Sequence, residues 1–166
     1  MKIEELAELC LYRNAATDLE SIQLLQDYLD LRFPEDYAGY LLKQNGGYFR
    51  EVSVETPWHP ESGDRLASIF HVDLERVKKS WDPCRVECDD YDLDDAVGCM
   101  ESVLLLQEEK PIRHLPIAST ALGHLVVFSF KDGVLERIGI KGAFIEGIQP
   151  YCHTFQAFIE SLKPSK

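Results

Sequence analysis

A change in hydrophobic period at Asn45-Gly46-Gly47 narrows the choice of folds more than any other feature of this sequence. Before this point apolar residues recur every three or four positions, which is typical of helices that pack on one face. After it, residues 49–54 follow a period of two, which indicates a strand. A chain that starts with helices and continues with strands is expected to form an α+β fold.

Three helices are predicted before this change. The first covers residues 3–12, and the second begins at Thr17, which forms a Thr-x-x-Glu capping box with Glu20. The third begins beside Pro34, which suits the first turn of a helix, and it ends where Gly46 and Gly47 accept left-handed backbone. The apolar stripes are Ile3, Leu6, Leu9 and Cys10 in the first helix and Ile22, Leu25 and Leu29 in the second.

The middle of the chain is predicted to contain shorter elements. Residues 66–70 indicate a short apolar element, residues 73–79 a helical turn and residues 93–109 a helix with apolar residues at helical spacing. A length of 166 residues with 45% hydrophobic content suffices for one core, so residues 1–166 are predicted to form a single domain.

A meander and a closing helix are predicted for the last third. Residues 114–118 lead into a strand over residues 123–130, which is rich in β-formers. Lys131-Asp132-Gly133 is a hairpin turn signal, after which residues 134–140 return as the next strand. The closing helix carries an apolar stripe of Phe155, Phe158, Ile159 and Leu162, which we expect to be buried against the sheet.

The chain is strongly acidic, which excludes several classes of partner. It has 17 basic and 29 acidic residues, a net charge of -12. Nucleic-acid binding needs clustered Lys and Arg, and an anionic membrane surface would repel such a chain. No apolar run reaches the roughly 18 residues of a membrane span, and the first residues do not have the pattern of a signal peptide. We therefore expect a cytoplasmic protein that binds neither nucleic acid nor membrane.

The acidity is concentrated in one part of the sequence. Residues 1–130 carry a net charge of -13, and the densest point is residues 87–95, with six acids. We consider this run either a solvated loop or a partner-facing patch. A calcium loop is the less favoured alternative, because Asp95 stands where such a loop needs glycine, and no metal site is predicted. The candidate partner-binding acids are Glu87, Asp89, Asp90, Asp92, Asp94 and Asp95.

Two tryptophans close to prolines complete the set of candidate binding residues. Trp58 and Trp81 lie in predicted loops, where a large aromatic side chain either anchors an interface or covers the core. The sequence does not decide between these roles for Trp58, and it slightly favours the core for Trp81.

Catalytic and cofactor motifs are not found in the sequence. It has no G-x-S-x-G, no H-E-x-x-H and no phosphate-binding G-x-x-x-x-G-K-[ST], and its five histidines have no ligand spacing. The five cysteines are irregularly spaced, as expected of thiols in a reducing compartment. We therefore predict neither an enzyme nor a cofactor.

Three blocks of sequence resemble the SUKH superfamily, which contains fungal cell-wall synthesis regulators and bacterial toxin-immunity proteins. They are FPEDYAGYLLKQNGG, LPIASTALGHLVVFSFKDG and TFQAFIESL, and with the helix before the first they span about residues 17–163. One departure is the loop at Ser119–Leu122, where the family usually has an acidic or polar residue before the glycine. A polar contact of that loop is therefore expected to be missing.

The resemblance implies a curved, mainly antiparallel sheet flanked by helices, without catalytic chemistry. It also implies an immunity protein that binds and neutralises a cognate toxin, often a nuclease. A nuclease carries a basic surface toward its substrate, so an acidic inhibitor would complement it. The alternative is an intracellular regulator or adaptor like the fungal members. The resemblance names neither the toxin nor the oligomeric state.

Overall fold

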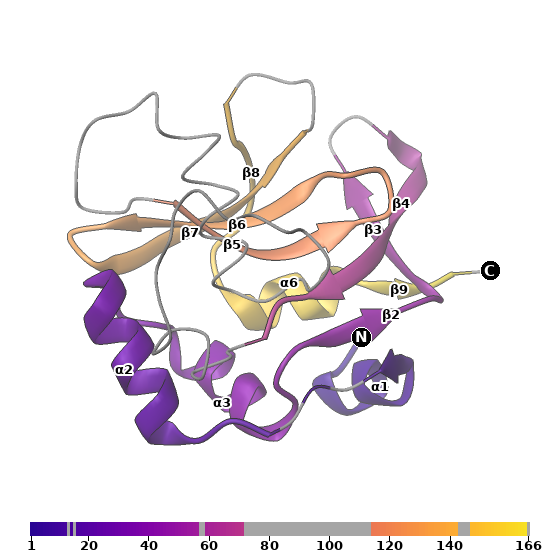
Figure 1. Cartoon of the computed structure of the whole chain (residues 1–166). Helices are drawn as coiled ribbons and strands as arrows, with labels where there is room; N and C mark the ends of the chain where they lie inside the picture. The colour runs from indigo at the N-terminus through magenta and orange to yellow at the C-terminus, as the bar shows by residue number, and fades with distance from the viewer. Residues whose placement is uncertain (13, 15, 57–58, 72–113, 143–146, 166) are drawn as a thin grey trace, which may run out of the picture.

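A nine-stranded antiparallel sheet with helices against it forms the described part of the chain (Figure 1). The computed structural model describes residues 1–12, 14, 16–56, 59–71, 114–142 and 147–165. The helices are α1 (Ile3–Glu8), α2 (Leu19–Leu29), α3 (Glu35–Lys43) and α6 (Phe155–Ser161). The strands are β1 (Cys10–Tyr12), β2 (Gly47–Phe49), β3 (Val52–Thr56), β4 (His59–Ile69), β5 (His114–Thr120), β6 (Leu125–Lys131), β7 (Val134–Lys141), β8 (Gln149–Cys152) and β9 (Lys163–Pro164).

The strand order is β1-β2-β4-β5-β6-β7-β8, and β3 pairs with both β4 and β9 beside this path. Figure 1 shows β2 and α1 at one end of the sheet and β8 at the other, with α3 and α6 along the same face. The β6–β7 hairpin turns at Asp132-Gly133, where both residues have positive φ, as the turn signal predicts. The prediction of an α+β fold with a mainly antiparallel sheet is confirmed.

The first predicted helix is too long. It ends at Glu8, and Cys10–Tyr12 forms strand β1 instead of a further turn. The helical spacing of Leu9 and Cys10 is outweighed by pairing with β2, in which Cys10 is opposite Phe49. The cap of α2 is also shifted by one residue, because Asp18 rather than Thr17 accepts the backbone N–H of Ser21 at 2.7 Å.

The strand predicted over residues 49–54 is two strands. The chain bends at Arg50-Glu51, so β2 ends before the bend and β3 begins after it, with Val52 and Val54 fully buried. The short apolar element predicted at 66–70 is the end of the eleven-residue strand β4. Its first half was missed because Pro60 and Gly63 are poor strand formers. The helices predicted at 73–79 and 93–109 lie outside the described residues.

An aromatic cluster joins the helices to the sheet. The ring of Tyr37 on α3 lies 4.9 Å from Phe128 of β6 and 4.9 Å from Phe155 of α6, in edge-to-face geometry. The predicted stripe of the closing helix is confirmed, since Phe155, Phe158, Ile159 and Leu162 are all buried. The backbone N–H of Gln156 donates to Asp36 at the start of α3, which connects the two helices directly.

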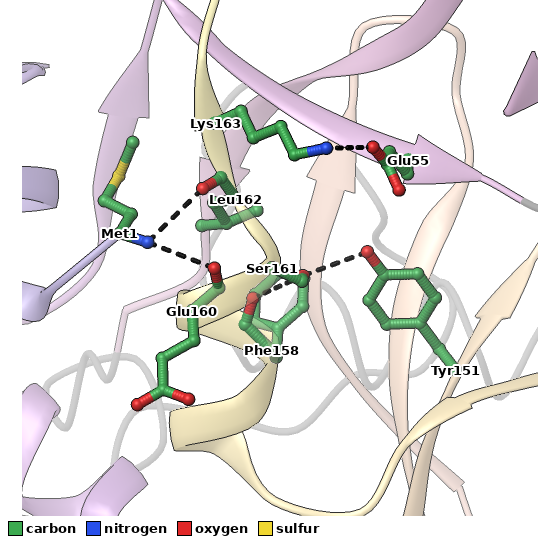
Figure 2. A network of polar contacts seen from close by, with 8 residues as sticks. All are labelled: Met1, Glu55, Tyr151, Phe158, Glu160, Ser161, Leu162 and Lys163. Atoms are coloured by element: carbon green, nitrogen blue, oxygen red, sulfur yellow. Dashed lines mark hydrogen bonds and ion pairs between the residues drawn. The ribbon is translucent and has the colours of Figure 1, made fainter. Parts of the chain in front are cut away.

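The C-terminal end of α6 is held by both ends of the chain (Figure 2). The amino group of Met1 donates to the carbonyl oxygens of Glu160 at 3.1 Å and Leu162 at 3.5 Å. A positive group at this position suits the negative end of the helix dipole. Beyond the helix, Lys163 forms an exposed ion pair with Glu55 of β3. These contacts place the N-terminal segment, and with it α1, against the body of the fold.

Deletion of one ring from the aromatic cluster should destabilise the fold strongly. Phe158 is fully buried, so Phe158→Ala removes a large side chain that the surroundings cannot replace. We expect it to lower the free energy of unfolding by about 3–5 kcal/mol in a urea titration. Gln156→Ala on the exposed face of the same helix should lower it by less than about 1 kcal/mol. A loss below about 1 kcal/mol for Phe158→Ala would mean that α6 is peripheral.

The buried hydroxyl of Tyr37 is expected to lower the stability of the fold. It is buried without a hydrogen-bond partner in the described part of the chain, and burial raises the pKa of Tyr37 well above its usual value. An unsatisfied buried hydroxyl costs about 1–3 kcal/mol, so Tyr37→Phe should raise the melting temperature. The matched control is Tyr40→Phe, which removes an acceptor of the Gln44 side-chain amide and should not stabilise. A lowered melting temperature for Tyr37→Phe would contradict the unpaired state of its hydroxyl.

Candidate functional site

The binding residues predicted from sequence lie outside the described residues, but their attachment points are defined. Trp58 falls between Thr56 and His59, which are paired at the β3–β4 hairpin. Trp81 and the acids at 87–95 fall in the segment 72–113, which joins β4 to β5. Because β4 has eleven residues and spans roughly 33 Å, the two parts of the predicted site attach at opposite ends of this strand.

The loop in which a polar contact was expected to be missing has one from another strand. The carboxylate of Asp64 on β4 lies 3.0 Å from the Nδ1 of His124, and both side chains are buried. Its other oxygen accepts the backbone N–H of Leu122 at 3.3 Å and that of Arg65 at 2.7 Å. The β5–β6 turn is therefore fastened to β4 by a buried carboxylate. Sequence reasoning missed Asp64 because β4 and the β5–β6 turn are far apart in the sequence and meet only in the folded structure.

Two histidine pairs resemble parts of a catalytic triad, but they lie at different places. His114 is within 3.1 Å of the Ser129 hydroxyl, while His124 pairs with Asp64. His124 and Ser129 are five residues apart along the chain, which is roughly 17 Å in a strand. Ser129 is also 2% exposed, so a substrate cannot approach its hydroxyl. The two pairs thus do not combine into one Ser-His-Asp site.

The two described cysteines are not placed as nucleophiles. Burial raises the pKa of the Cys152 thiol to about 11, so it is almost entirely protonated near neutral pH. Its neighbour Tyr151 also has a raised pKa, chiefly through burial, and its hydroxyl donates to Ser161 (Figure 2). The Cys10 thiol donates to the backbone oxygen of Tyr12 at 3.0 Å. Among the residues described here, no group of three or more His, Cys, Asp or Glu side chains could hold a metal ion.

An exposed apolar surface lies on the edge strand β1. Leu11 and Tyr12 are 61% and 62% exposed, and the ring of Tyr12 lies 6.2 Å from that of Tyr48 on β2. We call Leu11, Tyr12 and Tyr48 the β1 edge. Tyrosine is enriched at binding hot spots, so this surface suits a protein partner better than a small substrate. Sequence analysis missed it because Leu11 and Tyr12 were assigned to a helix.

Comparison with known proteins identifies the family of the chain. No curated protein matches the chain. None of the helices in the described ranges has the length and apolar character needed to cross a membrane. A family model does match, over residues 16–161, and this range includes the first two sequence blocks that carry the resemblance and all but the last residue of the third. The chain therefore belongs to the SMI1 / KNR4 family (SUKH-1).

Proposed function

We propose that this chain is a cytoplasmic immunity protein, which binds a cognate toxin with a basic surface and neutralises it without catalysis. Its family supports an immunity-type or regulatory module in general. The observation that carries the narrower proposal is the net charge of -12. A toxin that acts on nucleic acid must present a basic surface, and an acidic protein is attracted to it at long range.

The segment 72–113 supplies half of that charge. It contains twelve acidic and six basic residues, a net of -6, and the six acids at 87–95 are its densest part. We propose these six acids as partner-facing, with Trp58 and Trp81 as aromatic anchors. Charges at the rim of an interface act mainly on the rate of encounter, whereas buried aromatic anchors act mainly on dissociation. The two groups of residues are therefore separable by kinetics.

Neutralisation of the acidic run should slow association with the toxin. Changing Asp89, Asp90, Asp92, Asp94 and Asp95 to Asn should lower the association rate constant by at least about tenfold at low salt, with dissociation changed less than about twofold. Surface plasmon resonance from about 10 mM to 150 mM salt measures both rates, because the Debye length falls from about 30 Å to about 8 Å.

A matched control separates this patch from total charge. It neutralises five exposed acids elsewhere, namely Glu20, Glu35, Glu51, Asp132 and Glu136, and so removes the same charge. We expect it to retain most of the wild-type association rate. If both variants slow association equally, net charge rather than the acidic run attracts the toxin.

Growth rescue tests the immunity function itself. Cells that express the cognate toxin should survive only when the chain is co-expressed. Trp58→Ala and Trp81→Ala should each weaken rescue if these residues are anchors. Absence of rescue, together with recovery of an endogenous regulatory protein in pull-downs from the host, would favour the regulator or adaptor function instead.

A further inference from the structure

Strand β9 covers one edge of β3 with a ladder of only two residue pairs. Ser53 is opposite Lys163, and the other pair contains Pro164, which has no N–H to donate. Just beyond this ladder, the backbone N–H of Ser165 donates to the carbonyl oxygen of Glu51 at 2.8 Å. Both residues of β9 are exposed. Such a strand opens at low cost, because local opening costs least where few buried contacts are lost.

The helix before β9 is anchored without it. The amino group of Met1 donates to the carbonyl oxygens of Glu160 and Leu162, and the side chain of Leu162 is buried in the core. The hydroxyl of Tyr151 donates to Ser161 in the last turn of α6. Release of β9 therefore leaves α6 and the core in place and uncovers the backbone of β3.

The side chain of Lys163 shows which chemistry this edge receives. Its ammonium forms an ion pair with Glu55 of β3, and the two side chains are 64% and 52% exposed. Burial is the main reason that the pKa of Tyr151 is raised, and among the smaller effects Glu55 raises it and Lys163 lowers it. The Tyr151 side chain thus lies near both charges, as Figure 2 shows. A carboxylate with an aromatic ring nearby suits Lys or Arg.

The charge of Glu55 decides between two occupants of this edge. A second copy of the chain would bring another Glu55 and a further net charge of -12 to it, and like charges on paired strands are destabilising. A segment that carries Lys or Arg would instead repeat the contact that Lys163 already makes. We call the backbone of Glu51 and Ser53, with the side chains of Glu55 and Tyr151, the β3 edge.

We propose that the β3 edge is a docking site for a short extended segment of the protein partner that carries Lys or Arg, and that β9 occupies this site until the segment displaces it. The incoming cation pairs with Glu55 beside Tyr151, and the incoming backbone pairs with Ser53. This inference rests on the proposed function, since it assigns a surface that receives the basic toxin. Because β9 competes from within the chain, only a segment that binds better than β9 gains the site.

A peptide titration with β9 released tests this site. The probe is acetylated and amidated Leu-Lys-Pro-Ser, the sequence of residues 162–165, added to ¹⁵N-labelled full-length protein and followed by NMR. The released variant combines Lys163→Gln, which removes the ion pair, with Ser165→Pro, which removes the bond to Glu51. We expect saturable shifts at residues 51–55. The dissociation constant should be at least about tenfold lower for the released variant than for the wild type.

A charge-reversed peptide and two further substitutions locate the cation. The peptide Leu-Glu-Pro-Ser should bind the released variant at least about tenfold more weakly than Leu-Lys-Pro-Ser. Glu55→Gln in the released variant should weaken Leu-Lys-Pro-Ser at least about fivefold. Glu20→Gln on α2 removes the same charge elsewhere and is the matched control, with an expected change below about twofold. Lys163→Gln alone replaces the double variant if that variant does not fold.

Displacement itself is measured in the wild type. Saturating Leu-Lys-Pro-Ser should speed hydrogen exchange at the amide of Ser165, because that amide loses its bond to Glu51 when β9 leaves. Unchanged exchange at this amide while the peptide binds at residues 51–55 would show that β9 does not occupy the docking site.

Four further results would overturn the proposal. They are no shifts at residues 51–55 in the released variant, equal binding of the two peptides, equal losses from Glu55→Gln and Glu20→Gln, or a dimer of the released variant in sedimentation. The outcome is independent of growth rescue. If the peptide binds at the β3 edge but no toxin is neutralised, the proposed function fails while the docking site remains. If rescue succeeds but the peptide does not bind there, the docking site fails while the proposed function remains.

Discussion

At Gly46 and Gly47 three stretches of chain come so close that no side chain fits between them. A Cβ atom on Gly46 would lie 2.6 Å from the backbone oxygen of Ile69, and one on Gly47 would lie 2.5 Å from the Cys10 sulfur. Both glycines have positive φ, which side chains disfavour. The two glycines follow α3, which ends at Lys43, and Gly47 starts β2 and lets β1 and β4 pack close beside it. The order of strands at this end of the sheet depends on that contact.

This contact also explains which parts of the fold were predictable. The stripe of Phe155, Phe158, Ile159 and Leu162 is a local signal, and its predicted burial is confirmed. The third helix ends close to the predicted place, but its cap is Gln44 in extended conformation, and the left-handed glycines come only after it. The β1 strand was not predictable, because Cys10–Tyr12 becomes extended only when Gly47 admits it beside β2. Local sequence continues the helix at that point, and tertiary pairing overrides it. The first half of β4 was missed for a different reason, since Pro60 and Gly63 hide a strand that pairs with the neighbouring β3.

The candidate site was less predictable than the fold. Composition located the acidic run and the two tryptophans, but a position in the sequence does not give a position on the surface. The exposed side chains of Leu11 and Tyr12 were missed because residues 3–12 were predicted as one helix, in which these two residues lie outside the apolar stripe. Asp64 was missed because its role depends on a turn sixty residues away in the chain, at His124. A buried Asp–His contact is weak evidence for stability, so we interpret this one as a contact that fixes the geometry of the turn.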